Sequence, residues 1–242
     1  MIDPWLWLGA CIFLAYTLEA MTGFGSVVIA LSLGALLLPI PTILPVLVSL
    51  NVCMSGFLVW KLRAAVERRL LSRAILPLML TGTLLGLALG PWLDDLVLKR
   101  GFGLLILGFA LRELLHLSQG RPSVPPPDWL TRLQIGAAGL SHGLFASGGP
   151  LLVQALAGTR LDKARLRATL VCVWFILNGC LTLAFLLRGS LAPALPQIAA
   201  YLPLLVIGVL LGEHLHQRIE ERHFRIGLHL LLCVTGALLI CR

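Results

Sequence analysis

Long apolar stretches, separated by short charged or glycine-rich segments, alternate along the chain of 242 residues. A membrane helix needs about 20 apolar residues to cross a hydrocarbon core of about 30 Å, whereas the strands of a membrane barrel alternate with a period of two. The uninterrupted apolar runs therefore predict an all-α polytopic membrane protein. We expect helices or half-helices at 6–22, 26–38, 43–60, 74–93, 101–117, 133–146, 151–157, 168–187, 198–212 and 226–241.

Two glycine-rich breaks interrupt the apolar pattern. The first is Gly23-Phe24-Gly25, and the second is Ser147-Gly148-Gly149-Pro150. The apolar segments that follow these breaks are short, and 151–157 is far too short to cross a membrane. We expect each break to separate two half-helices or re-entrant arms of one helix pair.

The composition excludes an ordinary cytoplasmic globule. Hydrophobic residues make up 58% of the chain and charged residues only 12%, with a mean hydropathy of +0.95. Soluble domains carry about 25% charged residues. The first five residues include no basic residue, so we expect the first apolar segment to be kept as a membrane helix and not cleaved as a signal peptide.

The net charge of +8 comes from basic residues that lie between the apolar segments. Because Lys and Arg mark cytoplasmic loops, this pattern indicates topology and not a nucleic-acid partner. When each glycine-broken pair returns to its starting side, 15 Lys and Arg fall on the inside, and four on the outside. We therefore predict a bacterial inner-membrane protein with both termini on the extracytoplasmic side.

The two halves of the chain resemble each other. Gly25 aligns with Gly149 at an offset of 124, and Thr42, Asn51 and Cys53 align with Thr169, Asn178 and Cys180 at an offset of 127. Each half contains an odd number of crossings in the predicted topology, so the repeats are expected to be inverted. We divide the chain into a first repeat (1–117), a cytoplasmic linker (118–132) and a second repeat (133–242).

Inverted repeats with interrupted helices are typical of secondary transporters, whose site lies where the repeats meet. Each break exposes backbone N–H groups at a helix N-terminus, where the helix dipole favours an anion. The alternative is that the glycines only permit close packing or a tight turn. The candidate ligands at the two breaks are Gly23, Gly25, Ser26, Ser147, Gly148 and Gly149.

Polar side chains within the apolar segments are further candidates. Asn51 and Asn178 lie about halfway along their segments and should face the interior, as substrate ligands or as hydrogen bonds between helices. Cys53 and Cys180 lie about 200° away from them on a helix, so packing is favoured over a thiol relay. Glu19 is a candidate coupling residue for protons, with a snorkelling helix end as the alternative.

One other pattern is set aside. Gly139-Leu140-Ser141-His142-Gly143 fits G-x-S-x-G, but it falls within a predicted membrane helix and not after a strand. His142 and Gln154 flank the second break and are either pathway-lining or satisfied polar residues. We expect no catalytic residues, no metal site and no cofactor.

The glycine breaks resemble those of the TauE/SafE family of sulfite-exporter-like permeases. The resemblance rests on Gly23-Phe24-Gly25-Ser26, on the segment 139–150, and on Ala164-Arg165-Leu166-Arg167-Ala168-Thr169, and it covers nearly the whole chain. It implies transport of small sulfur oxyanions or organosulfonates.

The sequence therefore predicts a permease that exports a small anion, such as sulfite, across the inner membrane. The expected partners are the anion and the lipid bilayer, and a homodimer is left open. An importer of the same fold, coupled to protons or sodium through Glu19, is one alternative. A membrane thiol or redox enzyme that uses Cys53 or Cys180 is the other.

Overall fold

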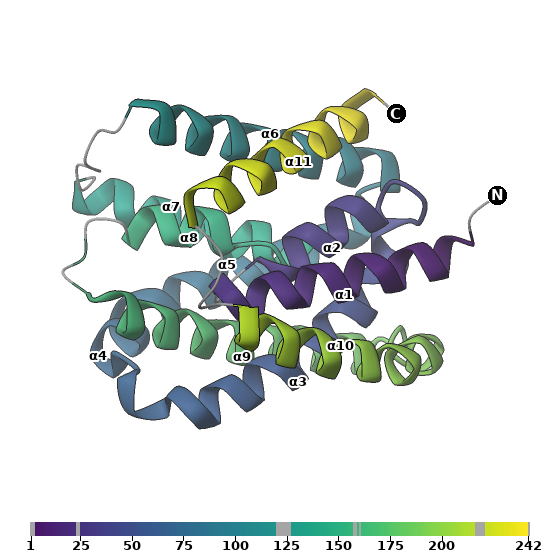
Figure 1. Cartoon of the computed structure of the whole chain (residues 1–242), viewed down its shortest axis with the longest axis horizontal. Coiled ribbons are helices and arrows are strands. Elements are labelled where there is room, and N and C mark those ends of the chain that lie inside the picture. The colour runs from purple at the N-terminus through teal and green to yellow at the C-terminus, as the bar shows by residue number, and fades with distance from the viewer. Residues whose placement is uncertain are drawn as a thin grey trace.

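The computed structural model describes residues 3–22, 25–119, 127–156, 159, 161–215 and 221–241, and these residues form helices without strands. The fold is the all-α membrane architecture that the apolar pattern predicts (Figure 1). The α-helices are α1 (Pro4–Thr22), α2 (Ser26–Gly34), α3 (Ile40–Leu62), α4 (Arg68–Leu70), α5 (Leu76–Leu89), α6 (Asp95–Gln119), α7 (Asp128–Phe145), α8 (Gly149–Leu156), α9 (Lys163–Leu187), α10 (Leu195–Leu215) and α11 (Glu221–Cys241).

Four helical stretches within the described residues are long and apolar enough to cross a membrane. They are Ile40–Ala65, Arg68–Trp92, Ala164–Leu187 and Ala192–Gly212, and two shorter apolar helices lie at Pro4–Ala20 and Ile226–Cys241. Their outer faces carry large apolar side chains that water would disfavour, for example Leu84 and Leu210, each 62% exposed. These faces fit a lipid environment, and the protein is a multi-pass membrane protein.

The helices extend further than the apolar runs that predict them. α6 begins at Asp95 and α9 at Lys163, in both cases several residues before the apolar run. α2 and α5 are exceptions: α2 ends at Gly34 and not at residue 38, and α5 spans Leu76–Leu89 within the expected 74–93. α6 reaches Gln119 and α7 begins at Asp128, so helix occupies both edges of the stretch expected as a linker, and the division into repeats stays a prediction.

The long helices pack in pairs that join the two halves of the chain. α1 packs against α10 and α5 against α7, while α3 packs against α9 and α6 against α11. Suppose that the repeats superpose so that α1, α3, α5 and α6 correspond, in this order, to α7, α9, α10 and α11. The pair α1–α10 then corresponds to the pair α7–α5, whereas the pairs α3–α9 and α6–α11 each correspond to themselves. A pseudo-two-fold relation would produce this pattern, although the inversion of the repeats relative to a membrane stays a prediction.

The contact between α5 and α7 depends on glycines. A Cβ atom at Gly82 would meet the Gly136 carbonyl oxygen, and a Cβ atom at Gly143 would meet that of Thr83. Small residues at these positions let the two helix backbones approach closely, which is how membrane helices commonly associate.

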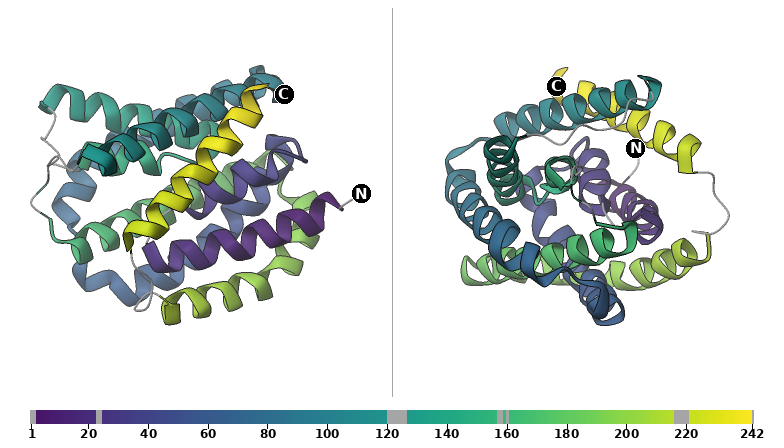
Figure 2. Two further views of the ribbon diagram at one scale, coloured as in Figure 1. Left: turned by 45° about the horizontal axis from the view of Figure 1, so that its top comes forward. Right: turned by 90° about the vertical axis from the view of Figure 1, so that its left-hand side faces the viewer.

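The short helices α2 and α8 lie inside the ring of longer helices (Figure 2). Every residue of α2 is buried, which fits a short helix that is apolar on all sides. Both short helices begin at a glycine-rich break, as predicted: α2 directly after Gly25 and α8 at Gly149.

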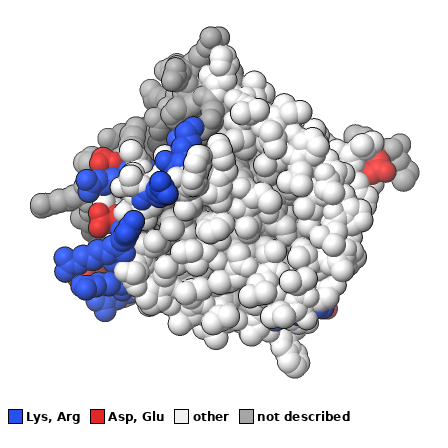
Figure 3. All heavy atoms as spheres, turned by 90° about the horizontal axis from the view of Figure 1, so that it is seen from below, with Lys and Arg blue, Asp and Glu red and all other residues white. Residues whose placement is uncertain are grey.

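The two ends of the molecule differ in charge. α1 begins and α11 ends at one end, on the right in Figure 1. Lys and Arg gather at the opposite end, on the left in Figure 3, where α3 leads into α4 and where α9 begins. We call this the basic end; it includes Lys61, Arg63, Arg68, Arg69, Arg73 and Arg165.

Candidate functional site

The first break lies between the end of α1 at Thr22 and the start of α2 at Ser26. Gly25 has a φ of 106°, in the left-handed region that favours glycine, and Ser26 begins α2 directly after it. Gly23, predicted as a backbone donor, lies outside the described residues. The N-terminus of α2 lies beside the side chain of Glu19, near the end of α1.

The second break makes a similar turn with different chemistry. Ala146 follows α7 with a φ of 50°, and its N–H donates to the His142 carbonyl at 2.7 Å. A Cβ atom at Gly148 would meet the Ala138 carbonyl oxygen, so only glycine fits there. Gly148 thus has a packing role, whereas Gly149 opens α8 at the edge of a pocket.

The carboxyl group of Glu19 lies at the start of α2. Its Oε2 accepts a hydrogen bond of 2.7 Å from the Ser26 backbone N–H, the first of the helix. Its side chain is 2% exposed, so it does not snorkel to water. A carboxylate at this position satisfies an unpaired donor and interacts favourably with the positive end of the helix dipole.

Asn51 and Asn178 join the two halves at this point. Asn51 Nδ2 donates to Ser26 Oγ at 3.1 Å and lies 3.3 and 3.4 Å from the two carboxylate oxygens of Glu19. Asn178 Nδ2 donates to Asn51 Oδ1 at 2.7 Å. The predicted interior position of both asparagines is confirmed, since each is 2% exposed.

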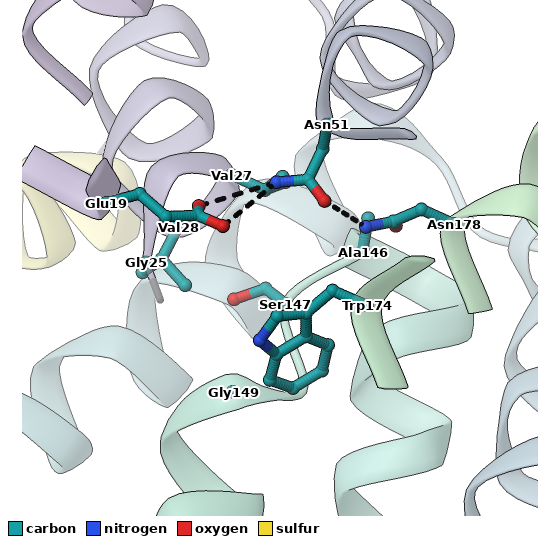
Figure 4. Close-up of a pocket in the computed structure, with 10 residues that line it drawn as sticks. All are labelled: Glu19, Gly25, Val27, Val28, Asn51, Ala146, Ser147, Gly149, Trp174 and Asn178. Carbon is teal, nitrogen blue, oxygen red and sulfur yellow. Dashed lines mark hydrogen bonds between the residues drawn. The ribbon is translucent and has the colours of Figure 1, made fainter. Parts of the chain in front are cut away.

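A pocket with about 280 Å³ of empty space, part of it open to its surroundings, lies beside this network. Its lining comes from both halves of the chain and from both breaks (Figure 4). The lining residues are Glu19, Gly25, Val27, Val28, Asn51, Ala146, Ser147, Gly149, Trp174 and Asn178. Ser26 and Gly148 are neighbours of lining residues and do not themselves line it.

Three polar atoms of the lining have no hydrogen-bond partner among the described residues. They are Ser147 Oγ, the indole Nε1 of Trp174 and Asn178 Oδ1, and all three residues are at most 6% exposed. In Figure 4 the Ser147 hydroxyl and the Trp174 nitrogen turn toward the side where Gly25 lies. Buried donors without a partner are costly, so this part of the pocket is suited to a polar ligand.

The two helix N-termini at the pocket differ in their electrostatics. At α2 the Glu19 carboxylate already accepts from the first N–H. At α8 the neighbouring side chains are the hydroxyl of Ser147 and the indole of Trp174, which both donate. The α8 side of the pocket therefore offers donors to an anion, whereas on the α2 side the first N–H already donates to the Glu19 carboxyl group.

The structure brings together most of the residues that the sequence pointed to. Cys53 and Cys180 are not among them, because both are exposed on the outer surface of their helices. Ser141 lies within α7 and donates to the Ser147 carbonyl at 2.8 Å, so the G-x-S-x-G motif has a structural role. Groups of three or more His, Cys, Asp or Glu that could hold a metal are absent from the described part of the chain.

Trp174 is the one lining residue with a polar side-chain atom that sequence reasoning missed. A tryptophan within an apolar segment is typical of a membrane helix and does not by itself indicate a site. It precedes Asn178 by four positions, which places both on one face of α9. The ring also stacks on His142, with centroids 5.8 Å apart. The spacing to Asn178 was the available signal.

A membrane protein with a buried polar pocket between two broken helix pairs has the arrangement of a secondary transporter. The chain belongs to the family described as "Sulfite exporter TauE/SafE", whose sequence model matches residues 8–239. It is also similar to a protein of Comamonas testosteroni described as "Probable inner membrane transporter protein TsaS", with 29% identity over 165 residues, 67% of this chain and 68% of that protein. No solved structure matches. The protein is therefore a membrane transporter.

Proposed function

We propose that the protein exports a small anion, a sulfur oxyanion or an organosulfonate such as sulfite, across the bacterial inner membrane. The observation that carries the proposal is the α8 side of the pocket. There the start of α8, the Ser147 hydroxyl and the Trp174 indole provide buried donors, and both side-chain donors lack a partner among the described residues. Such donors bind an anion without a buried Lys or Arg.

The family and the relative support the rest of the proposal. The family description names sulfite export, and the description of the Comamonas protein names the inner membrane. An inside-negative potential favours the exit of an anion by about 2.3 kcal/mol per charge per 100 mV. Export by uniport therefore needs no coupled ion.

The proposed mechanism uses the two halves as inverted repeats that expose the pocket to one side at a time. The pairing of α1 with α10 and of α5 with α7 supports a pseudo-two-fold relation. The basic end is proposed to face the cytoplasm, which leaves both termini on the extracytoplasmic side. Asn51 and Asn178, which connect the halves, would hold the pocket together during this motion.

Import coupled to protons is a second candidate, favoured by Glu19. Its carboxylate lines the same pocket, so an incoming anion is repelled unless the carboxylate carries a proton or moves away. Binding of the anion would then be linked to binding of a proton at Glu19.

Proteoliposomes test the proposal. Vesicles are loaded with sulfite, sulfate, thiosulfate or a sulfonate, and efflux is followed under a potassium-diffusion potential, negative inside. The proposal expects potential-driven release of at least one of these anions, and loss of that release in the Asn51→Ala, Asn178→Ala double variant. Release that needs an imposed proton gradient would favour the coupled importer. No release of any anion by folded protein would refute both.

A further inference from the structure

The inner face of α9 carries a row of side chains that leads from the basic end to the pocket. Arg167, Val171, Trp174 and Asn178 follow at intervals of four, three and four residues, so they share one side of the helix. The last three are at most 6% exposed, so this side faces the interior. At about 1.5 Å per residue, Arg167 lies about 16 Å before Asn178 along the helix.

Arg167 is the charged residue of this row, and it contacts the end of α1. Its Nη2 donates to the Ala20 carbonyl at 3.1 Å, and its guanidinium interacts electrostatically with the Glu19 carboxylate. Its Nε is buried and has no partner among the residues that the structure describes. The carbonyl end of α1 carries the negative end of the helix dipole, which favours a cation there.

The corresponding face of α3 has no such row. At the offset of 127 that aligns Asn51 with Asn178, Arg167 aligns with Ile40 and Trp174 with Leu47. Both are buried apolar residues of the core. Apart from Asn51 at the pocket, the α3 face therefore offers apolar side chains, whereas the α9 face carries Arg167 and Trp174 and leads to the basic end.

We infer that Arg167 is the first side chain to bind the anion on its way from the basic end, and that its contact with the Ala20 carbonyl closes this entrance in the present structure. The inference rests on the proposed function. The guanidinium offers planar paired donors that match an oxyanion, and its free Nε is one of them. An anion that replaces the Ala20 carbonyl as acceptor releases α9 from α1 and continues past Trp174 to Ser147 and α8.

Arg165 provides a matched control. It lies on α9 two residues before Arg167 and its side chain is 59% exposed. It pairs with Glu67 at 3.7 Å and with Asp162 at 3.5 Å. Such exposed pairs contribute little, so Arg165→Gln removes the same charge from the basic end without touching the inner face.

The first test measures sulfite transport from each side, in membrane vesicles of known orientation. Arg167→Gln is expected to raise the half-saturating sulfite concentration at the basic end by at least about tenfold, because a charge-assisted hydrogen bond is lost. The half-saturating concentration of Arg167→Gln at the opposite end should stay within about twofold of that of the unmodified protein. The same holds for Arg165→Gln at the basic end, since this variant leaves the contact of Arg167 intact. Arg167→Lys, which keeps the charge but not the planar fork, should fall between.

The second test measures closure directly and does not depend on transport. In a cysteine-free background, Val28→Cys places a thiol in the pocket lining, and a membrane-impermeant thiol reagent is added at the basic end. Arg167→Gln is expected to speed labelling, and Arg165→Gln is not. Equal effects of the two arginine variants, or no effect of Arg167→Gln in either test, would overturn the inference. If the unmodified protein moves none of sulfite, sulfate, thiosulfate and the sulfonate but Arg167→Gln still speeds labelling, the proposed function fails while the closure stands.

Discussion

The hydrogen bonds around Asn51 and Asn178 predict unequal effects of removing the two amides. Asn51 donates to Glu19 and to Ser26 Oγ, and it accepts from Asn178. Asn178 makes a single side-chain hydrogen bond in this network, the one to Asn51. The two asparagines lie at corresponding positions of their helices and are equally buried. We therefore expect the difference in stability loss to come from the hydrogen bonds that Asn51 makes with Glu19 and Ser26.

The magnitudes follow from these bonds. Hydrogen bonds between membrane helices contribute about 0.6 kcal/mol on average and about 1.7 kcal/mol at most, and bonds to charged groups contribute about 1.5–3 kcal/mol. Asn178→Ala should therefore lower the free energy of unfolding by about 1 kcal/mol. Asn51→Ala, which removes the hydrogen bonds to three partners and leaves the buried carboxyl group of Glu19 with one donor fewer, should lower it by about 3 kcal/mol.

Unfolding in mixed micelles with increasing dodecyl sulfate, followed by helical circular dichroism, measures both values. The double variant completes a mutant cycle, and the coupling between the two asparagines should be about 0.6–1.7 kcal/mol. Equal losses for the two single variants, or a coupling that does not differ from zero, would refute the network as the connection between the halves.

Three further predictions concern the pocket. Trp174→Phe, which keeps the ring and removes the unpartnered donor, should weaken binding of the transported anion by about tenfold with stability unchanged, and equal affinity in a titration would contradict this. Glu19→Gln should tighten anion binding, because like charges in one pocket repel by about 1–2 kcal/mol at an effective dielectric constant of 20; weaker binding would count against the shared pocket. Cys53→Ser with Cys180→Ser should leave efflux within about twofold, since both thiols face outward. A loss of activity would instead support the thiol enzyme.

The positions of the helices were largely predictable, because the apolar runs and the charges between them record where the chain meets lipid and water. The first and last residues of the helices were less predictable. α9 begins at Lys163 because Asp162 caps it by accepting from the Arg165 N–H at 2.8 Å, a local bond that outweighs the polar character of the first turn. Hydropathy does not register such a cap.

Most residues of the site were predictable, but the difference between the α2 and α8 sides of the pocket was not. Gly25 and Gly149 stand out because they lie where the apolar pattern is broken, and Asn51 and Asn178 because amides are unusual within apolar runs. The contact between the Glu19 carboxyl group and the start of α2 was not predictable, because it depends on how α1 and α2 pack against each other. The two breaks therefore looked equivalent in the sequence, whereas only the α8 side leaves its donors for a ligand.

The most direct test of anion binding at α8 is a crystal structure with selenite or selenate, used as a selenium analogue of the sulfur oxyanion that shows efflux. The anomalous signal of selenium locates the anion independently of side-chain interpretation. We expect the peak beside the first residues of α8, within hydrogen-bond distance of Ser147 Oγ and Trp174 Nε1. A peak elsewhere in the membrane region, with this pocket empty at saturating anion, would contradict the assignment.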